Sequence, residues 1–408
     1  MSTLVLLTES YPLGGLTEPS FIGPEIDALA AEFDRVIIAP VLNRGPLLPL
    51  PPNVTADRSF LSRRPSSTDK GVSLLWPDTW RHIWADSSFI HSPRQALAAL
   101  AFSAYARHYR RQIHKLITHH SLDLANTLFY SFWFDYHTAA LAGINGAKFI
   151  TRAHGYDIYD SENPFLSHSW RQAALARMEA CFPVSDHGTD YIRTDYPEYA
   201  EKVHTRHLGT AHPAGINPPP SPADGDSAFT LMSIARVAPE KRVDLLCRCL
   251  CHWAGTHPSR QVRWIHVGDG PLMDALRREV AKAPANLTTE LTGALPNAEV
   301  HRLLATRHVD ITAMLSRSEG LGLAACESLS YGVPVIATAV GGLPETIDVR
   351  TGVLLSPDPT PEEFARRLDE AMPSLTQMRP DARIRWAENF DASRLRREFA
   401  NEIRKMLP

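Results

Sequence analysis

Short apolar runs alternate with amphipathic segments along the first half of the chain. The runs that predict buried strands are Thr3–Leu7, Arg35–Pro40, Thr127–Ser131, Lys148–Arg152, Ala180–Pro183 and Val203–His207. Between the first two runs, apolar residues recur at helical spacing from Phe21 to Phe33. Strands that alternate with helices indicate a parallel α/β sheet.

A segment without periodicity, rich in proline and glycine, spans Ala211–Ser227 and predicts a linker. The alternation restarts after it with FTLMSIAR, VRWIHVG, LTTELTG, VDITAML and PVIATAV as strands. We therefore predict a domain over residues 1–210, the linker at 211–227, and a second domain over 228–385. The end of the chain, 386–408, is helical and could cross back to the first domain. Two α/β halves joined in this way would form a cleft, where ligands commonly bind.

Length and composition narrow the class of protein. At 408 residues, two domains are expected. The net charge of −3 provides no global attraction to nucleic acid, and no nucleic-acid partner is expected. The start, MSTLVLLTESYP, predicts a strand rather than a signal peptide, and no run approaches the roughly 18 apolar residues of a membrane span. A soluble, cytoplasmic protein is therefore expected.

Five cysteines lack the spacing of a disulfide framework and predict free thiols. Cys247, Cys249 and Cys251 could suggest a metal site. They lie in a predicted apolar helix without a second ligand pair, which favours buried thiols.

One insertion, from Arg44 to about Lys115, interrupts the alternation. It contains Trp76, Trp80 and Trp84 and ends in a long amphipathic helix. Between Arg58 and Lys115 it carries ten Lys and Arg residues against three Asp. Two interpretations stay open: a solvated basic helix face, or a surface for an anionic acceptor or a membrane, with Arg107, Arg110 and Arg111 as the contact.

The passage richest in candidate chemistry is Ser316–Ile347. A buried strand ends there in polar residues, followed by Glu319, by Gly320-Leu321-Gly322, and by a helix that starts near Leu323 and carries Glu327. A glycine-rich turn that leads into a helix presents unpaired backbone N–H groups, which can bind phosphate. Carboxylates on both sides could accept hydrogen bonds from sugar hydroxyls. Alone, the passage could equally be an ordinary strand–turn–helix.

Two further passages follow strands of the second domain. Arg236 and Lys241 lie in SIARVAPEKRVD, and a cationic pair at a strand's carboxyl end suits a diphosphate. IHVGDGPL contains the turn Gly268-Asp269-Gly270. Each signal alone is weak.

In this order and spacing, the three passages resemble the family-4 retaining glycosyltransferases of GT-B fold, also called group 1 glycosyltransferases of surface polysaccharide assembly. Glu319 and Glu327 match that family's E-x7-E pair, and Gly-x-Pro-Val-Ile-Ala-Thr follows. The resemblance covers the second domain and, more loosely, the first. It implies two Rossmann-like domains that face each other across a cleft, with the last helix crossing back to the first domain.

The resemblance also implies roles for residues of the second domain. Arg236 and Lys241 would bind the diphosphate of a nucleotide-sugar, Glu319 the donor sugar, and Glu327 the ribose. Gly320, Leu321, Gly322 and Leu323 would lie close to sugar and phosphate, and Leu295 beside the base. The sequence departs from the family at Ala235 and at Arg242, where glycines are common, and this puts the local backbone geometry in doubt.

In the first domain, Gly14 and Gly15 match the family's N-terminal glycine-rich loop, near the sugar phosphate and the acceptor. His154, in RAHGYDIYD, would point toward the donor sugar, whereas a lone histidine is more often structural. The resemblance implies His154, Glu319, Arg236 and Lys241 as the catalytic set.

The implied reaction moves a sugar from a UDP- or GDP-sugar to an acceptor hydroxyl with retention, without a cofactor. No Asp-x-Asp pattern lies at the end of a predicted strand, and this predicts no metal requirement. The basic, aromatic insertion favours a lipid-linked saccharide as acceptor, at the inner face of the cytoplasmic membrane. Alternatives are a sugar-nucleotide epimerase or phosphorylase, or a catalytically silent GT-B subunit. A dinucleotide-binding oxidoreductase is disfavoured, because G-x-G-x-x-G is absent after the first strand.

Overall fold

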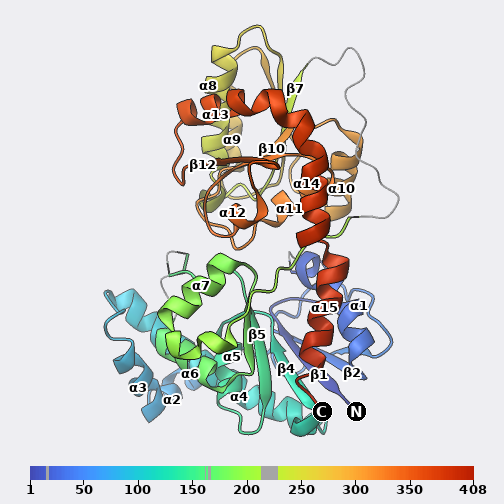
Figure 1. Cartoon of the computed structure of the whole chain (residues 1–408). Coiled ribbons are helices and arrows are strands. Elements are labelled where there is room, and N and C mark those ends of the chain that lie inside the picture. Colours follow the sequence, from blue (N-terminus) through green and yellow to red (C-terminus); the bar gives the residue numbers. More distant parts are fainter. Residues whose placement is uncertain (15–17, 161, 164–166, 213–227) are drawn as a thin grey trace. The chain divides into compact units, whose positions relative to one another are not determined.

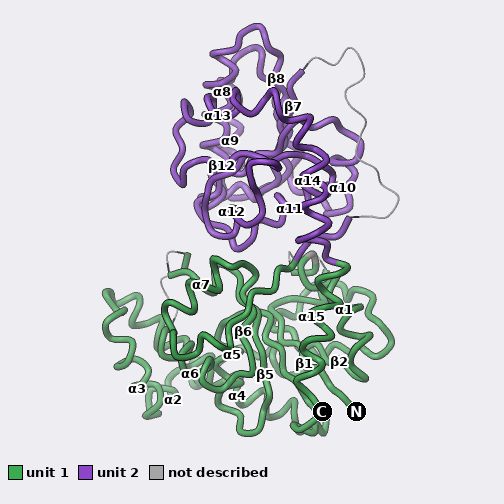
Figure 2. Tube along the Cα trace, viewed as in Figure 1, with its two compact units in different colours: residues 1–208, 393–408 green, residues 209–392 purple. Residues whose placement is uncertain are grey.

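The computed structural model describes residues 1–14, 18–160, 162–163, 167–212 and 228–408. Gly15 and most of the predicted linker, residues 213–227, lie outside this part. The chain divides into two compact units, residues 1–208 with 393–408 and residues 209–392 (Figure 2). Each unit is an α/β domain built around one parallel sheet.

The first unit contains a six-stranded sheet with the order β3-β2-β1-β4-β5-β6 (Figure 1). Its strands are β1 (Thr3–Thr8), β2 (Arg35–Pro40), β3 (Val54–Ala56), β4 (Thr127–Ser131), β5 (Lys148–Ala153) and β6 (Ala180–Pro183). Its helices are α1 (Pro19–Glu32), α2 (Ser67–Ser73), α3 (Pro77–Ala85), α4 (Pro93–His119), α5 (Tyr136–Ala142), α6 (His168–Arg177), α7 (Asp186–Asp195) and α15 (Ala392–Arg404).

Alternation along β1 explains why helices cover both faces of this sheet. Leu4 and Leu6 pack into one apolar cluster, whereas Val5 and Leu7 pack into another on the opposite face. Successive side chains of a strand point to opposite sides, so a strand that is apolar throughout needs cover on both. α15 supplies part of that cover, because Phe399 packs in the same cluster as Leu4 and Leu6.

The second unit repeats the architecture with the order β12-β11-β10-β7-β8-β9. Its strands are β7 (Phe229–Ile234), β8 (Val262–Val267), β9 (Leu287–Leu291), β10 (Ile311–Met314), β11 (Val335–Thr338) and β12 (Gly352–Leu355). Its helices are α8 (Val243–Thr256), α9 (Met273–Val280), α10 (Asn297–Thr306), α11 (Leu323–Ser330), α12 (Leu343–Thr346), α13 (Pro361–Ala371) and α14 (Leu375–Asn389).

Three local expectations were wrong. Val203–His207 is not a strand: Val203 forms a single bridge to Cys181, at the edge of the sheet. The insertion is not wholly outside the sheet, since it contributes β3. The helix expected over 386–408 is two helices, α14 and α15, because the chain breaks at Phe390, whose carbonyl accepts the N–H of Thr210 at 2.9 Å.

Candidate functional site

A lysine and a glutamate meet where the loops after β7 and β10 end. Lys241 closes the short 3₁₀ turn Pro239–Lys241, and Glu319 follows the polar end of β10. Lys241 Nζ donates to Glu319 Oε1 at 2.6 Å, and Ser316 Oγ donates to the same oxygen at 2.7 Å. Both charged side chains remain partly exposed. Two residues 78 positions apart in the sequence are thus brought together with opposite charges at one edge of the sheet.

Arg242 stands where glycine is common in the family that the sequence resembles, and its backbone geometry was therefore in doubt. It adopts a left-handed backbone conformation, with φ of 47°, which glycine adopts more easily. Its buried guanidinium donates to the carbonyl oxygens of Leu315, Ser316 and Pro357 at 2.6 to 2.8 Å. The arginine therefore keeps the backbone turn and also ties the end of β10, where Ser316 binds Glu319, to the loop after β12.

Glycines bring the backbone close to Glu319 on its other side. Gly341 has φ of 51°, and a Cβ there would lie 1.8 Å from the Glu319 carbonyl oxygen. The N–H of Gly342 donates to that oxygen at 3.3 Å. Gly322, with φ of 86°, precedes the first turn of α11, so the turn from Gly320 leads directly into a helix N-terminus. The N–H groups of such a first turn have no partner within the helix and can bind an anion.

Glu327, on α11, belongs to a separate contact. Its Oε1 accepts Asn297 Nδ2 at 2.9 Å, from the start of α10. Burial raises the pKa of Glu327, and the hydrogen bond from Asn297 only partly opposes this. Leu295, just before α10, is partly buried beside the cluster under α10. An acidic group and an apolar residue therefore converge near α10, as ribose and base recognition would require.

Arg236 follows β7, and its side chain is exposed. Within the described ranges no ion pair involves it. It is therefore the cation of this edge with the greatest freedom to approach an anionic ligand.

The first unit holds its glycine-rich loop in a different way. Glu18, buried at the start of α1, accepts the backbone N–H groups of Glu9, Ser10 and Tyr11 that follow β1. Trp133 Nε1 donates to Glu18 Oε1 at 2.9 Å, the oxygen that also accepts the N–H of Glu9. Gly14 continues this loop, and its N–H donates to the Pro46 carbonyl at 2.8 Å. In the described part of this loop, the N–H groups of residues 9–11 are thus bound by a carboxylate of the same unit, and that of Gly14 by a backbone carbonyl.

His154 follows β5 and is largely buried. Its N–H donates to Asp157 Oδ1 at 2.6 Å, and its Nδ1 lies 3.3 Å from Asp157 Oδ2. Burial would raise the pKa of Asp157, but these contacts and the N–H of Phe134 outweigh it and leave that pKa lowered. The ring lies against Phe132 and Trp133, and its buried Nε2 has no hydrogen-bond partner in the described part of the chain.

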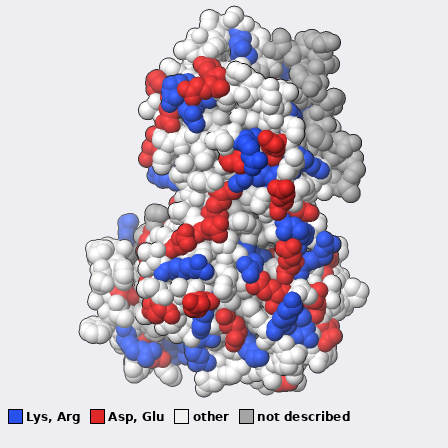
Figure 3. Space-filling model, in the orientation of Figure 1, with Lys and Arg blue, Asp and Glu red and all other residues white. Residues whose placement is uncertain are grey.

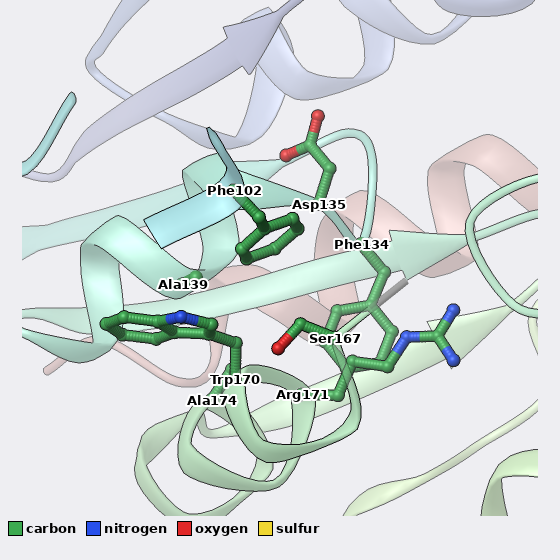
Figure 4. Close-up of a pocket in the computed structure, with 8 residues that line it drawn as sticks. All are labelled: Phe102, Phe134, Asp135, Ala139, Ser167, Trp170, Arg171 and Ala174. Atoms are coloured by element: carbon green, nitrogen blue, oxygen red, sulfur yellow. The ribbon is translucent and has the colours of Figure 1, made fainter. Parts of the chain in front are cut away.

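A pocket of about 220 Å³, partly open to solvent, lies near this region in the first unit (Figure 4). Phe102, Ala139 and Trp170 form an apolar wall, and the Asp135 carboxylate points away from Trp170. None of the residues that the sequence suggested for a donor site lines this pocket.

Two groups of residues could suggest a metal site, the three cysteines of α8 and a cluster around His120. Cys247 and Cys249 are buried and free, and Cys251 is partly buried. Asp57, His119 and His120 bring ligand atoms within 4.8 Å of one another. His120 Nε2 lies 2.6 Å from Asp57 Oδ2, and its Nδ1 lies 2.8 Å from Arg35 Nη2. An arginine at one ring nitrogen and a carboxylate at the other indicate a structural hydrogen-bond chain.

The structure thus joins Lys241 to Glu319, places Glu327 beside Asn297, and leaves Arg236 exposed. It places Gly14 and His154 at the edge of the other sheet, in the first unit. Sequence reasoning missed Asn297, Glu18 and the contacts of Arg242. An acidic residue directly before the helix-starting Pro19 could have signalled Glu18, since carboxylates favour helix N-termini.

Comparison with known proteins finds similar chains. Residues 219–389 match the family model described as glycosyl transferases group 1. The chain is 29% identical over 169 residues to a phosphatidylinositol N-acetylglucosaminyltransferase component of Arabidopsis thaliana, covering 41% of this chain and 35% of the relative. It is 24% identical over 287 residues to the putative colanic acid biosynthesis glycosyltransferase WcaL of Escherichia coli K12, covering 65% and 66%.

Among solved structures, the Anabaena protein Alr3699/HepE in complex with UDP superposes with a TM-score of 0.64 at 17% identity, covering 99% of both chains. This likeness concerns the fold. The chain spans about a third of the length of the first curated relatives that it matches. Residues 219–389 are thus similar to the glycosyl transferases group 1, and the two parallel six-stranded sheets share the GT-B fold of the similar solved structures.

Proposed function

We propose that this chain is a glycosyltransferase that moves a sugar from a nucleoside diphosphate sugar to a hydroxyl group of a saccharide or lipid-linked glycan precursor. The observation that carries the proposal is the contact of Lys241 Nζ with Glu319 Oε1 at 2.6 Å, at the carboxyl edge of the second sheet. Ligands of open α/β sheets bind outside the carboxyl ends of the strands. A cation for phosphate and a carboxylate for sugar hydroxyls are thus adjacent where a donor would bind.

The chemistry follows from which charges develop during transfer. The bond from the sugar's anomeric carbon to the diphosphate breaks, and negative charge grows on the departing oxygen. Fixed cations stabilise that charge more strongly in the transition state than in the bound donor. Lys241, the exposed Arg236 and the first turn of α11 are proposed for this role.

Retention and metal independence are part of the proposal. The acceptor hydroxyl attacks the face that the diphosphate leaves, and the departing phosphate oxygen takes its proton. Since Lys241 and Arg236 would supply the positive charge, no metal is needed to neutralise the diphosphate. Turnover should then be unchanged by EDTA. A loss that added metal restores would contradict this part.

UDP is the first nucleotide to test, because the Anabaena structure of similar fold is described as a complex with UDP. The names of the two relatives differ in what they state. The Arabidopsis protein is named for phosphatidylinositol, and the Escherichia coli protein is named for colanic acid biosynthesis. Both names favour a glycan or lipid-linked hydroxyl as the acceptor class.

The test is calorimetric titration of the whole chain with UDP, GDP and ADP. One nucleotide should bind, and Lys241→Ala should weaken its binding, whereas Lys282→Ala should not, because Lys282 is exposed and pairs only with Glu279. Donor consumption with an acceptor, followed by the anomeric configuration of the product, then tests transfer. Binding without turnover would favour a catalytically silent protein. Acceptor-independent epimerisation would favour an epimerase.

A further inference from the structure

Helix α3 presents its apolar side outward. Thr79 and His82 are buried, whereas Trp80 and Trp84 are exposed. Together with Trp76, these tryptophans recur every four residues, and residues i and i+4 share one face of a helix. A helix of a soluble domain normally turns its apolar stripe toward the core. In α3 the polar side faces the core and the tryptophans face solvent.

Polar contacts hold α3 in this orientation. The His82 ring stacks on Trp170 at 3.7 Å, and its Nδ1 lies 3.0 Å from Ser169 Oγ on α6. Asp86, just after α3, accepts the N–H of Ser169 at 2.8 Å. Burial lowers the pKa of His82 to about 4, so its inward ring is neutral near neutral pH. The outward tryptophans therefore belong to an anchored helix rather than to a frayed segment.

The turn between α2 and α3 adds to the same apolar surface. Leu75 is 81% exposed, and Trp84 at the other end of α3 is 80% exposed. Most exposed large apolar side chains of the described chain fall between residues 72 and 97: Val72, Leu74, Leu75, Trp76, Trp80, Trp84, Phe89 and Leu97. Such a concentration of exposed apolar side chains within one stretch of chain favours an interaction site.

The charges around this surface are mainly positive. Residues 58–115 carry ten Lys and Arg against three Asp, in a chain whose net charge is −3. Asp86 is buried, and Asp69 is hydrogen-bonded to Ser66 and paired with Arg111. Asp78, on α3, pairs with Arg81 at 3.4 Å, so these two charges offset each other. Figure 3 shows largely uncharged surface at the left, where Figure 1 places α3, with Lys and Arg below it.

The basic side chains that the sequence suggested as the contact are placed differently. Arg107 stacks on Trp76, with Cζ 3.8 Å from the ring centroid, and Arg111 pairs with Asp69. Arg110 is partly buried. Lys70, Arg81 and Arg94 are the exposed cations near the apolar surface.

We propose that the α2–α3 surface, residues 70–97, docks on an anionic lipid bilayer, with Trp80, Trp84 and Leu75 at the boundary between headgroups and acyl chains. Tryptophan favours that boundary, because its ring is apolar and its N–H is polar. Short helices with an apolar stripe and flanking cations lie in the interface plane. Each nearby Lys or Arg adds attraction to anionic lipid. None of the described helices is long and apolar enough to cross a membrane, so this contact would be peripheral.

The experiment is sedimentation of the whole chain with vesicles of phosphatidylcholine and phosphatidylglycerol in equal parts, and with phosphatidylcholine alone. The chain should bind the anionic vesicles, and high salt should weaken binding. Trp84→Ser should weaken it about tenfold or more, because burying one large apolar side chain contributes about 1.5 to 3 kcal/mol. Val349→Ser, at an 87% exposed apolar position of the second unit, is the matched control and should bind normally.

Lys70→Glu with Arg94→Glu should weaken binding to the anionic vesicles while sparing nucleotide binding. No vesicle binding by the unaltered chain would overturn the proposal. A Trp84→Ser variant that binds vesicles normally but no longer forms a dimer would also overturn it, in favour of a second copy as the occupant. Since the readout needs no donor or acceptor, failure of the transferase proposal would leave this result intact.

Discussion

The loops that follow β1 and β10 are both rich in glycine, yet they use their carboxylates differently. In the first unit, buried Glu18 binds the N–H groups of residues 9–11 and leaves them no free donor. In the second unit, Glu319 binds two side chains, Lys241 and Ser316, and stays partly exposed. A backbone bound internally sets a loop's shape, whereas side-chain pairs at a surface can exchange partners for a ligand.

From this difference we propose different tasks for the two edges. The loop after β1 is pre-shaped by its own carboxylate, which suits the positioning of an acceptor. The edge after β10 carries exchangeable charge, which suits a diphosphate and a sugar. Four predictions test this difference, from the largest expected effect to the smallest.

Lys241→Ala should reduce donor turnover about 100-fold or more, because removing one group that stabilises transition-state charge typically costs that much. The fold should persist, since the side chain is partly exposed. Steady-state kinetics checks the loss, and the thermal midpoint checks the fold. Lys282→Ala is the control. Unchanged turnover in Lys241→Ala would contradict the proposed role of Lys241 in stabilising the departing diphosphate.

Glu18→Gln should destabilise the first unit by about 2 kcal/mol, since charge-assisted hydrogen bonds from buried donors would be lost. Denaturant unfolding measures this change. Nucleotide binding should stay near that of the unaltered chain, because Glu18 contacts only residues of the first unit. Exposed Glu179→Gln is the matched control. Equal stability of the two variants would mean that the carboxylate does not shape this loop.

Arg242→Gly should destabilise the second unit by about 1 to 2 kcal/mol. Glycine would relieve the left-handed backbone, but the buried carbonyls of Leu315 and Ser316 would lose their donor. Arg242→Lys should keep the strain and lose the fork of contacts, and so be at least as unstable. Chemical unfolding of both variants decides. A Gly variant more stable than the unaltered chain would contradict the proposed tie.

Nucleotide binding should weaken several-fold toward acid pH through Glu327. Burial raises the pKa of this carboxyl group, and its ionised form accepts from two ribose hydroxyls more strongly than the protonated form. As pH falls through the raised pKa, protonation should compete with binding. Without ligand, the pH dependence concerns stability and has the opposite sign. The free energy of unfolding should fall as pH rises from glutamate's usual pKa to the raised one. Glu327→Gln should flatten both profiles in calorimetry. Profiles of unchanged slope would contradict the role of Glu327.

Much of the fold follows from local pattern. Five of the six strands expected in the first half are present, because apolar runs of that length can be buried only in a sheet covered on both faces. The exception, Val203–His207, lies at the edge, where only Val203 forms a bridge. β3 and β12 were not predicted; each has only three or four residues. Each pairs with the strand directly before it in the chain, and a run this short carries too little periodicity to be recognised.

The sequence by itself determined the two α/β units and singled out Arg236, Lys241, Glu319 and Glu327 as candidates, because strand periodicity and motif spacing are local properties. Only the tertiary structure decided which of them touch: Lys241 reaches Glu319, whereas Glu327 reaches Asn297. It also decided that Arg242 ties the end of β10 and that the tryptophans of α3 face outward. Such contacts join residues far apart in the chain, and their geometry is set by the packing of whole elements rather than by any local pattern.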